Sequence, residues 1–236
     1  MVLSANLTNL IKSVMGILNN GSLQLSSKSK MEIISALKPI TKQDVNLSIF
    51  KPTTPVSNQN KNIYINSPAP VLWMNILSAK LLSISVFVLR PDQRIPLHDH
   101  PGMYGFLKCI HGSLTIEAFT PKETVKSDLF ICESLPPYNI NVENNKVAVL
   151  DPSHGNIHQV IGASSPSAFI DVLIPPYAPI KRKCNYFEVT DQLPSGSVHL
   201  HTVENDLETY WTDVLLFDHE IDLNKYAGSL VYSPIS

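Results

Sequence analysis

Residues 82–88 read Leu-Ser-Ile-Ser-Val-Phe-Val, within a strand expected at 81–89, and this stretch shows the pattern that decides the fold. Apolar side chains recur at every second position, which is the period of a β-strand with one buried face. Further short candidates lie at 104–111, 113–119, 146–150, 167–174 and 184–189, with one more near Tyr210–Phe217. Many short strands without intervening helical patterns predict a mainly β sandwich or barrel.

Helical spacing is found in the amino-terminal part of the chain. Apolar residues recur at helical intervals from Leu7 to Leu18, and Asn19-Asn20-Gly21 is typical of a helix end. A second helix is expected over 30–38, because Ser29 and Glu32 have the spacing of a capping box. The two helices are predicted to pack on the strands as an appendage.

The chain has 236 residues, a length that suits one domain with a small appendage. Residues 51–62 are polar and contain two prolines, so a linker or a surface loop is expected there. We therefore divide the chain into a helical segment at 1–50 and a β-barrel domain at 60–236.

The composition excludes several classes of protein. With 18 basic and 20 acidic residues the net charge is −2, which does not fit a nucleic-acid binder that neutralises phosphates. Three cysteines do not make a disulfide framework, so a reducing compartment is expected. The sequence has no apolar run long enough for a membrane span, and its first twenty residues lack the basic region of a secretory signal. We expect a cytoplasmic monomer that binds neither nucleic acid nor membranes.

The histidines give the first indication of chemistry. His98 and His100 flank Asp99 at the end of an expected strand, so their imidazoles project from the same face. Such a pair can hold neighbouring positions on one metal ion, or it can be a pair of surface histidines at a turn. His199 and His201 have the same spacing, but an acidic stretch follows them, and we expect an exposed strand or loop there.

His154 and His158 are four residues apart, as on one face of a helix. Gly155 lies between them and Pro152 just before, so a helix is not expected and the two should not act together. His219 follows Asp218 near the end of the chain and is expected at the surface.

Four stretches carry a family resemblance. They are 96–103 (Pro-Leu-His-Asp-His-Pro-Gly-Met), 105–108 (Gly-Phe-Leu-Lys), 155–159 (Gly-Asn-Ile-His-Gln) and 169–177 (Phe-Ile-Asp-Val-Leu-Ile-Pro-Pro-Tyr). Together they resemble the cysteamine (2-aminoethanethiol) dioxygenase and plant cysteine oxidase family of thiol dioxygenases. The resemblance implies a cupin, a double-stranded β-helix barrel, and a reaction in which Fe(II) and O₂ convert a thiol to a sulfinic acid. It also implies a part in oxygen sensing through oxidation of amino-terminal cysteines.

The resemblance also implies a set of metal ligands. The first cupin motif places a glutamate shortly after its two histidines, but Tyr104 and Gly105 stand there. The second motif supplies a histidine, which is His158 here. The implied site is therefore His98, His100 and His158 without a carboxylate, and imidazoles of this kind suit iron. Substrate sulfur, bound to the metal as a thiolate, would then supply the missing negative charge.

Residues around this site receive roles from the same resemblance. Asp171 lies in an apolar strand, where it either faces solvent or points inward to orient a ligand histidine or hold a substrate amine. Tyr177, which follows Pro175-Pro176, is expected to bring its phenol near the open positions on the iron. Asp99 should point away from the ligands and serve the structure. Cys184 and Tyr186 are either half-buried strand residues or, as in animal enzymes of the family, partners in a thioether crosslink.

Three functions stay open at this point. The first is a thiol dioxygenase that acts on cysteamine or on the amino-terminal cysteine of a protein. Free cysteine would need a cation for its carboxylate, and of the three arginines Arg90 and Arg94 flank a turn rather than a pocket. The second is a cupin enzyme with other chemistry, which the missing carboxylate ligand disfavours. The third is a metal-binding or regulatory cupin without turnover.

Overall fold

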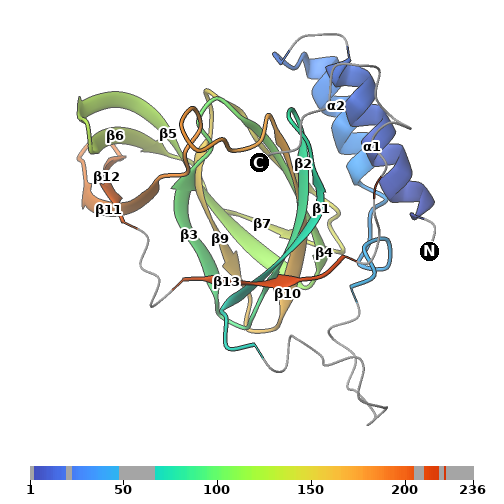
Figure 1. Cartoon of the computed structure of the whole chain (residues 1–236). Helices are drawn as coiled ribbons and strands as arrows, with labels where there is room; N and C mark the ends of the chain where they lie inside the picture. Colours follow the sequence, from blue (N-terminus) through green and yellow to red (C-terminus); the bar gives the residue numbers. More distant parts are fainter. Residues whose placement is uncertain (1–2, 20–22, 48–66, 205–209, 218–220, 222–236) are drawn as a thin grey trace.

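The computed structural model describes residues 3–19, 23–47, 67–204, 210–217 and 221. In these residues two helices precede thirteen strands. Figure 1 shows how they are arranged. They are α1 (Ala5–Leu18), α2 (Ser27–Leu37), β1 (Val71–Ser78), β2 (Ser83–Leu89), β3 (Arg94–Asp99), β4 (Tyr104–His111), β5 (Ser113–Lys126), β6 (Leu129–Ser134), β7 (Tyr138–Asn141), β8 (Val147–Leu150), β9 (Ile157–Gly162), β10 (Ser167–Ile174), β11 (Tyr186–Gln192), β12 (Ser197–Val203) and β13 (Thr212–Leu215). The mainly β barrel with a short helical appendage is therefore confirmed.

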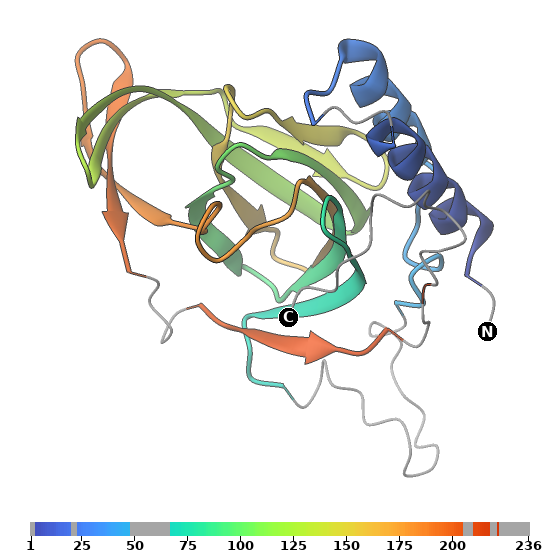
Figure 2. The ribbon, with the colours of Figure 1, turned by 45° about the horizontal axis from the view of Figure 1, so that its top comes forward.

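The strands form two facing sheets. One has the order β13-β1-β2-β10-β4-β8, and the other has the order β6-β12-β11-β3-β9-β5-β7. In the second sheet β6 also pairs with β5, so six of its strands join into a closed ring. Figure 2 shows β5, β6, β11 and β12 arching away on the side of the barrel opposite the helices. A small apolar cluster that includes Phe119, Phe187 and Leu200 fills this ring.

The helices cover the outer face of the first sheet (Figure 1). Buried residues of both helices belong to one apolar cluster with residues of β2 and β10, among them Val86 and Ile170. Burial of this kind contributes about 25 cal/mol for each Å² of apolar surface. No helix in the described part of the chain is long and apolar enough to cross a membrane.

Polar contacts also bind the helical segment to the barrel. The buried Lys108 ammonium on β4 donates to the Ile40 carbonyl at 2.6 Å. Lys30 on α2 pairs with Asp151, and its ammonium lies 5.1 Å from the centre of the Tyr104 ring. A buried ammonium needs such an acceptor, because an unpaired charge in the core is costly. The division into 1–50 and 60–236 stays a prediction, but these contacts cross it.

Several expected boundaries need correction. The helix expected at 30–38 begins at Ser27, and its cap is Ser26, whose hydroxyl accepts from the Ser29 amide at 3.1 Å. The capping box at Ser29 is therefore wrong, because Ser29 lies inside the first turn. Strand β5 continues past the expected end at 119 to Lys126, since its second half pairs with β6. Strand β11 begins at Tyr186, so Cys184 lies in the loop before it.

Gly112 makes the tight connection between β4 and β5 possible. Its φ angle is +69°, a conformation that side chains with a Cβ rarely adopt. A Cβ on this residue would lie 2.6 Å from the Pro166 carbonyl oxygen, so the position requires glycine. The turn sets the start of β5, which pairs with the strand that carries His158.

Candidate metal centre and its cavity

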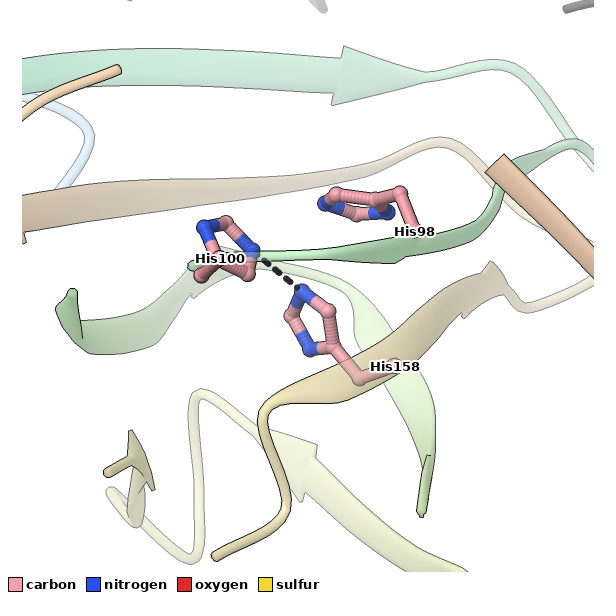
Figure 3. Close-up of side chains that lie close together, drawn as sticks. All are labelled: His98, His100 and His158. Atoms are coloured by element: carbon pink, nitrogen blue, oxygen red, sulfur yellow. Dashed lines mark hydrogen bonds between the residues drawn. The ribbon is translucent and has the colours of Figure 1, made fainter. Parts of the chain in front are cut away.

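The first sheet and the strands β3 and β9 enclose a cavity into which three histidines point. His98 lies on β3, His100 follows directly after this strand, and His158 lies on β9 as the direct partner of His98 in the ladder. Figure 3 shows the three rings turned toward one another. Each residue is at most 9% exposed. The pairing of β3 with β9 thus joins two motifs that are far apart in the sequence.

The three rings have the spacing of ligands to one metal ion. One ring nitrogen of each histidine lies within 4.8 Å of those of the other two. The Nε2 atoms of His100 and His158 are 3.0 Å apart. Nitrogen ligands at about 2.1 Å from a metal and at a right angle to each other would be about 3.0 Å apart. The positions of the ring nitrogens therefore fit a metal ion.

The electrostatics of the site favour neutral rings. Burial lowers the pKa of His98 to about 4. Burial, followed by repulsion from neighbouring histidines, lowers the pKa of His100 and of His158 well below the usual value. A metal ligand must be unprotonated at the coordinating nitrogen, so neutral imidazoles are the required form.

Hydrogen bonds to the ring nitrogens select the atoms that can coordinate. The Nδ1 of His98 donates to the Pro96 carbonyl at 2.8 Å. The Nδ1 of His100 donates to the phenol oxygen of Tyr177 at 2.9 Å, and this phenol donates to the Asp99 carbonyl at 2.6 Å. Because Nδ1 carries the proton in both rings, the Nε2 atoms of His98 and His100 each keep a lone pair that can coordinate a metal ion in the cavity. The buried Nδ1 of His158 has no partner in the described part of the chain.

Tyr177 lines the cavity and contacts one of the expected ligands. Its phenol accepts from the His100 Nδ1, on the ring edge away from the coordinating Nε2, and its expected place near the open positions on the metal stays a prediction. The cis bond between Ile174 and Pro175 precedes the turn that brings Tyr177 there. The geometry is that of a residue that orients a ligand.

Asp171 points into the cavity and is only 8% exposed, so the solvent-facing alternative is wrong. Burial raises the pKa of Asp171 to about 7, and a hydrogen bond with the Val172 backbone offsets part of this effect. Ser85 lies opposite Asp171 on β2. In the described part of the chain the carboxyl group makes no hydrogen bond to the three histidines. The Asp171 carboxyl group is therefore available to a ligand in the cavity.

The cavity has a volume of about 370 Å³. Its polar lining includes the three histidines and Asp171, and three hydroxyls come from Ser78, Ser83 and Ser85. Aromatic walls come from Phe87, Phe169 and several tyrosines. Among the described residues that line it, none is Lys or Arg. Arg90 lies outside, where its guanidinium donates to the Ala69 and Ser67 carbonyls, as expected for an arginine at a turn.

Cys184 lies between two phenols at the edge of the cavity. Its thiol contacts the hydroxyls of Tyr177 and Tyr186, and burial raises the pKa of this thiol to about 11. The thiol therefore lies beside the Tyr186 phenol, the other partner of the thioether crosslink that the resemblance implied. The crosslink itself stays a prediction.

The rival histidines lie outside the site. His199 and His201 lie on β12, so a strand is present as expected, but both residues are half-buried rather than exposed. They contact Asp191 at 3.5 Å and Asp128 at 3.0 Å. His154 does not belong to the group around His158, which agrees with the expectation that the two do not act together. His219 lies outside the described residues.

Sequence reasoning assigned no role to Asn156, although it stands in one of the motifs. Its side-chain oxygen accepts from the His100 amide at 3.1 Å, and its nitrogen donates to the carbonyls of Met103 at 3.3 Å and Asp151 at 3.2 Å. A buried amide with this many long-range partners fixes the backbone beside a ligand. Asp99 has the structural role that was expected, since its carboxylate accepts from the Asn185 backbone and side chain at 2.8 and 2.9 Å.

Comparisons with known proteins identify a family and several relatives. The family described as PCO_ADO matches residues 36–229. The chain is 32% identical to the 2-aminoethanethiol dioxygenase of Mus musculus over 52% of its own length and 56% of that protein. It is 30% identical to plant cysteine oxidase 1 of Arabidopsis thaliana over 92% of its own length and 75% of that protein. A solved protein of Klebsiella pneumoniae with a double-stranded beta-helix domain is 18% identical, with a TM-score of 0.33, over 46% of this chain and 80% of that one.

The two facing sheets and the three buried histidines define a metal-site cupin, as the resemblance implied. The chain belongs to the family of 2-aminoethanethiol dioxygenases and plant cysteine oxidases. The matched region spans about half the length of the mouse relative.

Proposed function

We propose that the protein is a non-haem iron thiol dioxygenase that adds both atoms of O₂ to an aminothiol and gives a sulfinic acid. The observation that carries this proposal is the cluster of three neutral, buried histidines without a carboxylate, next to Asp171 in one cavity. His98, His100 and His158 would hold Fe(II) through their Nε2 atoms. When bound, Fe(II) supplies positions for a thiolate and for O₂.

The residues of the chain supply orientation and protection. Tyr177 holds the ring of His100, and the Pro96 carbonyl holds the ring of His98. Asp171 offers a carboxylate to the ammonium group of an aminothiol. This ion pair would also compensate the buried negative charge of Asp171. The aromatic walls keep bulk water away from the sulfur, which favours the sulfinic acid over side reactions.

The size and charge of the cavity favour an amino-terminal cysteine as the substrate. A volume of about 370 Å³ lies in the range that accommodates drug-sized ligands, larger than cysteamine alone requires. The lining offers an anion for the amine, but no Lys or Arg among the described residues for the carboxylate of free cysteine. A peptide with cysteine at its amino terminus presents an amine and a thiol without that carboxylate.

The proposal predicts the mass of the product. Aerobic incubation of the Fe(II)-loaded protein with a peptide that begins with cysteine should raise the peptide mass by about 32 units, the second oxidation step of a thiol. With ¹⁸O₂ both added atoms should carry the label, and mass spectrometry measures this directly. In a parallel reaction the protein should oxidise cysteamine with a lower kcat/KM than the peptide.

Other outcomes separate the alternative functions. Iron that binds without oxygen consumption for either thiol would identify a metal-binding cupin without turnover. A disulfide as the main product, or label that comes from water, would exclude a dioxygenase.

A second prediction concerns Tyr177. The change Tyr177→Phe keeps the ring and removes the hydroxyl that holds the Nδ1 of His100. Loss of such a contact typically lowers metal affinity about 10- to 100-fold. Iron titration should show this weakening, while KM at saturating iron should change little. Tyr210→Phe is the matched control, because Tyr210 also lines the cavity but makes no hydrogen bond to a ligand histidine. Equal iron affinity in the two variants would contradict the positioning role.

A further inference from the structure

Two segments that line the cavity reach the surface at one end of the barrel. Ser78 and Ser83, at the ends of the β1–β2 turn, line the cavity, and Ser78 is exposed. On the other side Pro176 and Cys184 line the cavity from the loop between β10 and β11. Figure 1 shows this loop and the β1–β2 turn at the same end of the barrel. We call these two segments the rim.

The rim is basic although the whole chain is slightly acidic. The rim itself, residues 78–83 and 175–185, contains Lys80, Lys181, Arg182 and Lys183 and no Asp or Glu, whereas the net charge of the chain is −2. The nearest carboxylates are Asp99, which is held by Asn185 of the loop, and the exposed Glu188 on β11. The three lysines are exposed. Within the described part of the chain none of these four cations makes an ion pair with a carboxylate. Their charge is therefore available to a partner.

The basic loop has a defined shape. Ala178 and Arg182 exchange two backbone hydrogen bonds, of 3.2 and 3.0 Å, which close the loop at its base. The Arg182 guanidinium donates to the Pro176 carbonyl at 2.8 Å and so ties the loop to the cavity wall. Ile180 at the tip is 96% exposed, an unusual position for a large apolar side chain in a free surface loop. An ordered loop presents these groups at a low entropic cost of binding.

We propose that the basic rim binds acidic residues that follow the amino-terminal cysteine of a protein substrate. This inference rests on the proposed function, which places the cysteine in the cavity with its amine near Asp171. An extended chain advances about 3.3–3.6 Å with each residue, so the next few residues of the substrate must leave the cavity past the rim. There Lys181 and Lys183 meet acidic side chains, and Ile180 meets an apolar one.

The expected effect follows from the exposure of the charges. Each exposed ion pair contributes roughly a 1.4- to 5-fold change in affinity, and salt screens it. Ion pairs with Lys181 and Lys183 should therefore raise kcat/KM about 2- to 25-fold over a peptide with lysines at the same positions. The preference should fall as the ionic strength rises. Cysteamine has no such residues, and its oxidation should not depend on the rim.

The test compares two peptides that begin with cysteine and carry either Glu or Lys at their third to fifth positions. The iron-loaded parent should prefer the Glu peptide, and Lys181→Glu/Lys183→Glu should remove or reverse this preference while cysteamine turnover stays unchanged. Lys126→Glu/Lys146→Glu is the matched control, because it makes the same charge change at exposed positions away from the rim. Equal use of both peptides by the parent, or a preference that survives in the rim variant, would overturn the inference.

Binding gives a readout that does not depend on turnover. Fluorescence anisotropy with the same peptides carrying an unreactive amino-terminal serine should show tighter binding of the Glu peptide to the parent than to the rim variant. If the Glu peptide binds the parent more tightly but no thiol is oxidised, the proposed function is wrong, and the role of the rim in binding acidic peptides is supported. If vesicles of anionic phospholipid sediment with the parent and not with the rim variant, and peptides show no preference, the rim binds lipid instead and the inference is wrong.

Discussion

Replacing His158 with Ala should abolish iron retention and thiol oxidation together. The ring of His158 supplies one of three converging nitrogens, and its Nε2 lies only 3.0 Å from that of His100. Without it two imidazoles remain, and no described carboxylate belongs to the group that could replace the lost ligand. Iron content after dialysis, measured by elemental analysis, should fall to the background level. Oxygen consumption with a peptide that begins with cysteine should fall with it.

A change of both His199 and His201 to Ala is the control for this experiment. The two residues have the same spacing as His98 and His100 but lie on β12, where each contacts a surface aspartate. Iron content and turnover should stay at the level of the parent. Loss of iron in this double variant, or its retention after His158→Ala, would show that the metal binds elsewhere.

The second large effect is expected from Asp171→Asn. This change keeps the shape of the side chain and removes its charge. The Asp171 carboxyl group is buried, lines the cavity and makes no hydrogen bond to the ligand histidines in the described part of the chain. If it holds the substrate amine, the loss of the charge should lower kcat/KM for aminothiols about 10- to 100-fold. The loss should appear mainly in KM, with iron content unchanged.

A thiol without an amine separates the two roles that Asp171 could have. Such a thiol should be a poor substrate for the parent and only slightly worse for Asp171→Asn, because it never used the carboxylate. Ser85→Ala, which removes a neighbouring hydroxyl from the same wall, is a matched control for changes in cavity shape. A fall in iron content in Asp171→Asn would assign the residue to the histidines instead and would falsify the amine-binding role.

The strands that the sequence predicts best are apolar along most of their length and buried on both faces. β4 and β10 have the expected bounds because their apolar runs end at Gly, Pro or Ser. The pattern does not predict β1, β6, β7 and β9. Of these, β6 and β7 are short and partly exposed and depend on pairing with β5. The pattern also misses the extension of β5, where the exposed residues do not alternate with apolar ones.

The site, like the fold, could be predicted only in part from the sequence. The three histidines lie together because the motifs that carry them fall on paired strands. The hydrogen-bond partners of their Nδ1 atoms were not predictable. Every residue has a backbone carbonyl, and the sequence does not show which one, such as that of Pro96, accepts from a histidine. The hydrogen bond between His100 and Tyr177 was not predictable for a related reason. The position of Tyr177 depends on the turn that follows Pro175-Pro176, and a motif gives the order of residues but not the direction of that turn.

Strand β10 has a consequence for how the length of this chain can vary. Its residues alternate between the two sides of one wall, since Phe169, Asp171 and Leu173 line the cavity while Ile170 and Val172 join the core under the helices. Insertion or deletion of a single residue would turn the carboxylate into the helix core and an isoleucine into the cavity. Length changes are therefore excluded from this wall. The loop from Ala178 to Arg182 is closed at its own base and can be lengthened or shortened without moving the wall. Such changes could alter which proteins reach the cavity while the reaction inside it stays the same.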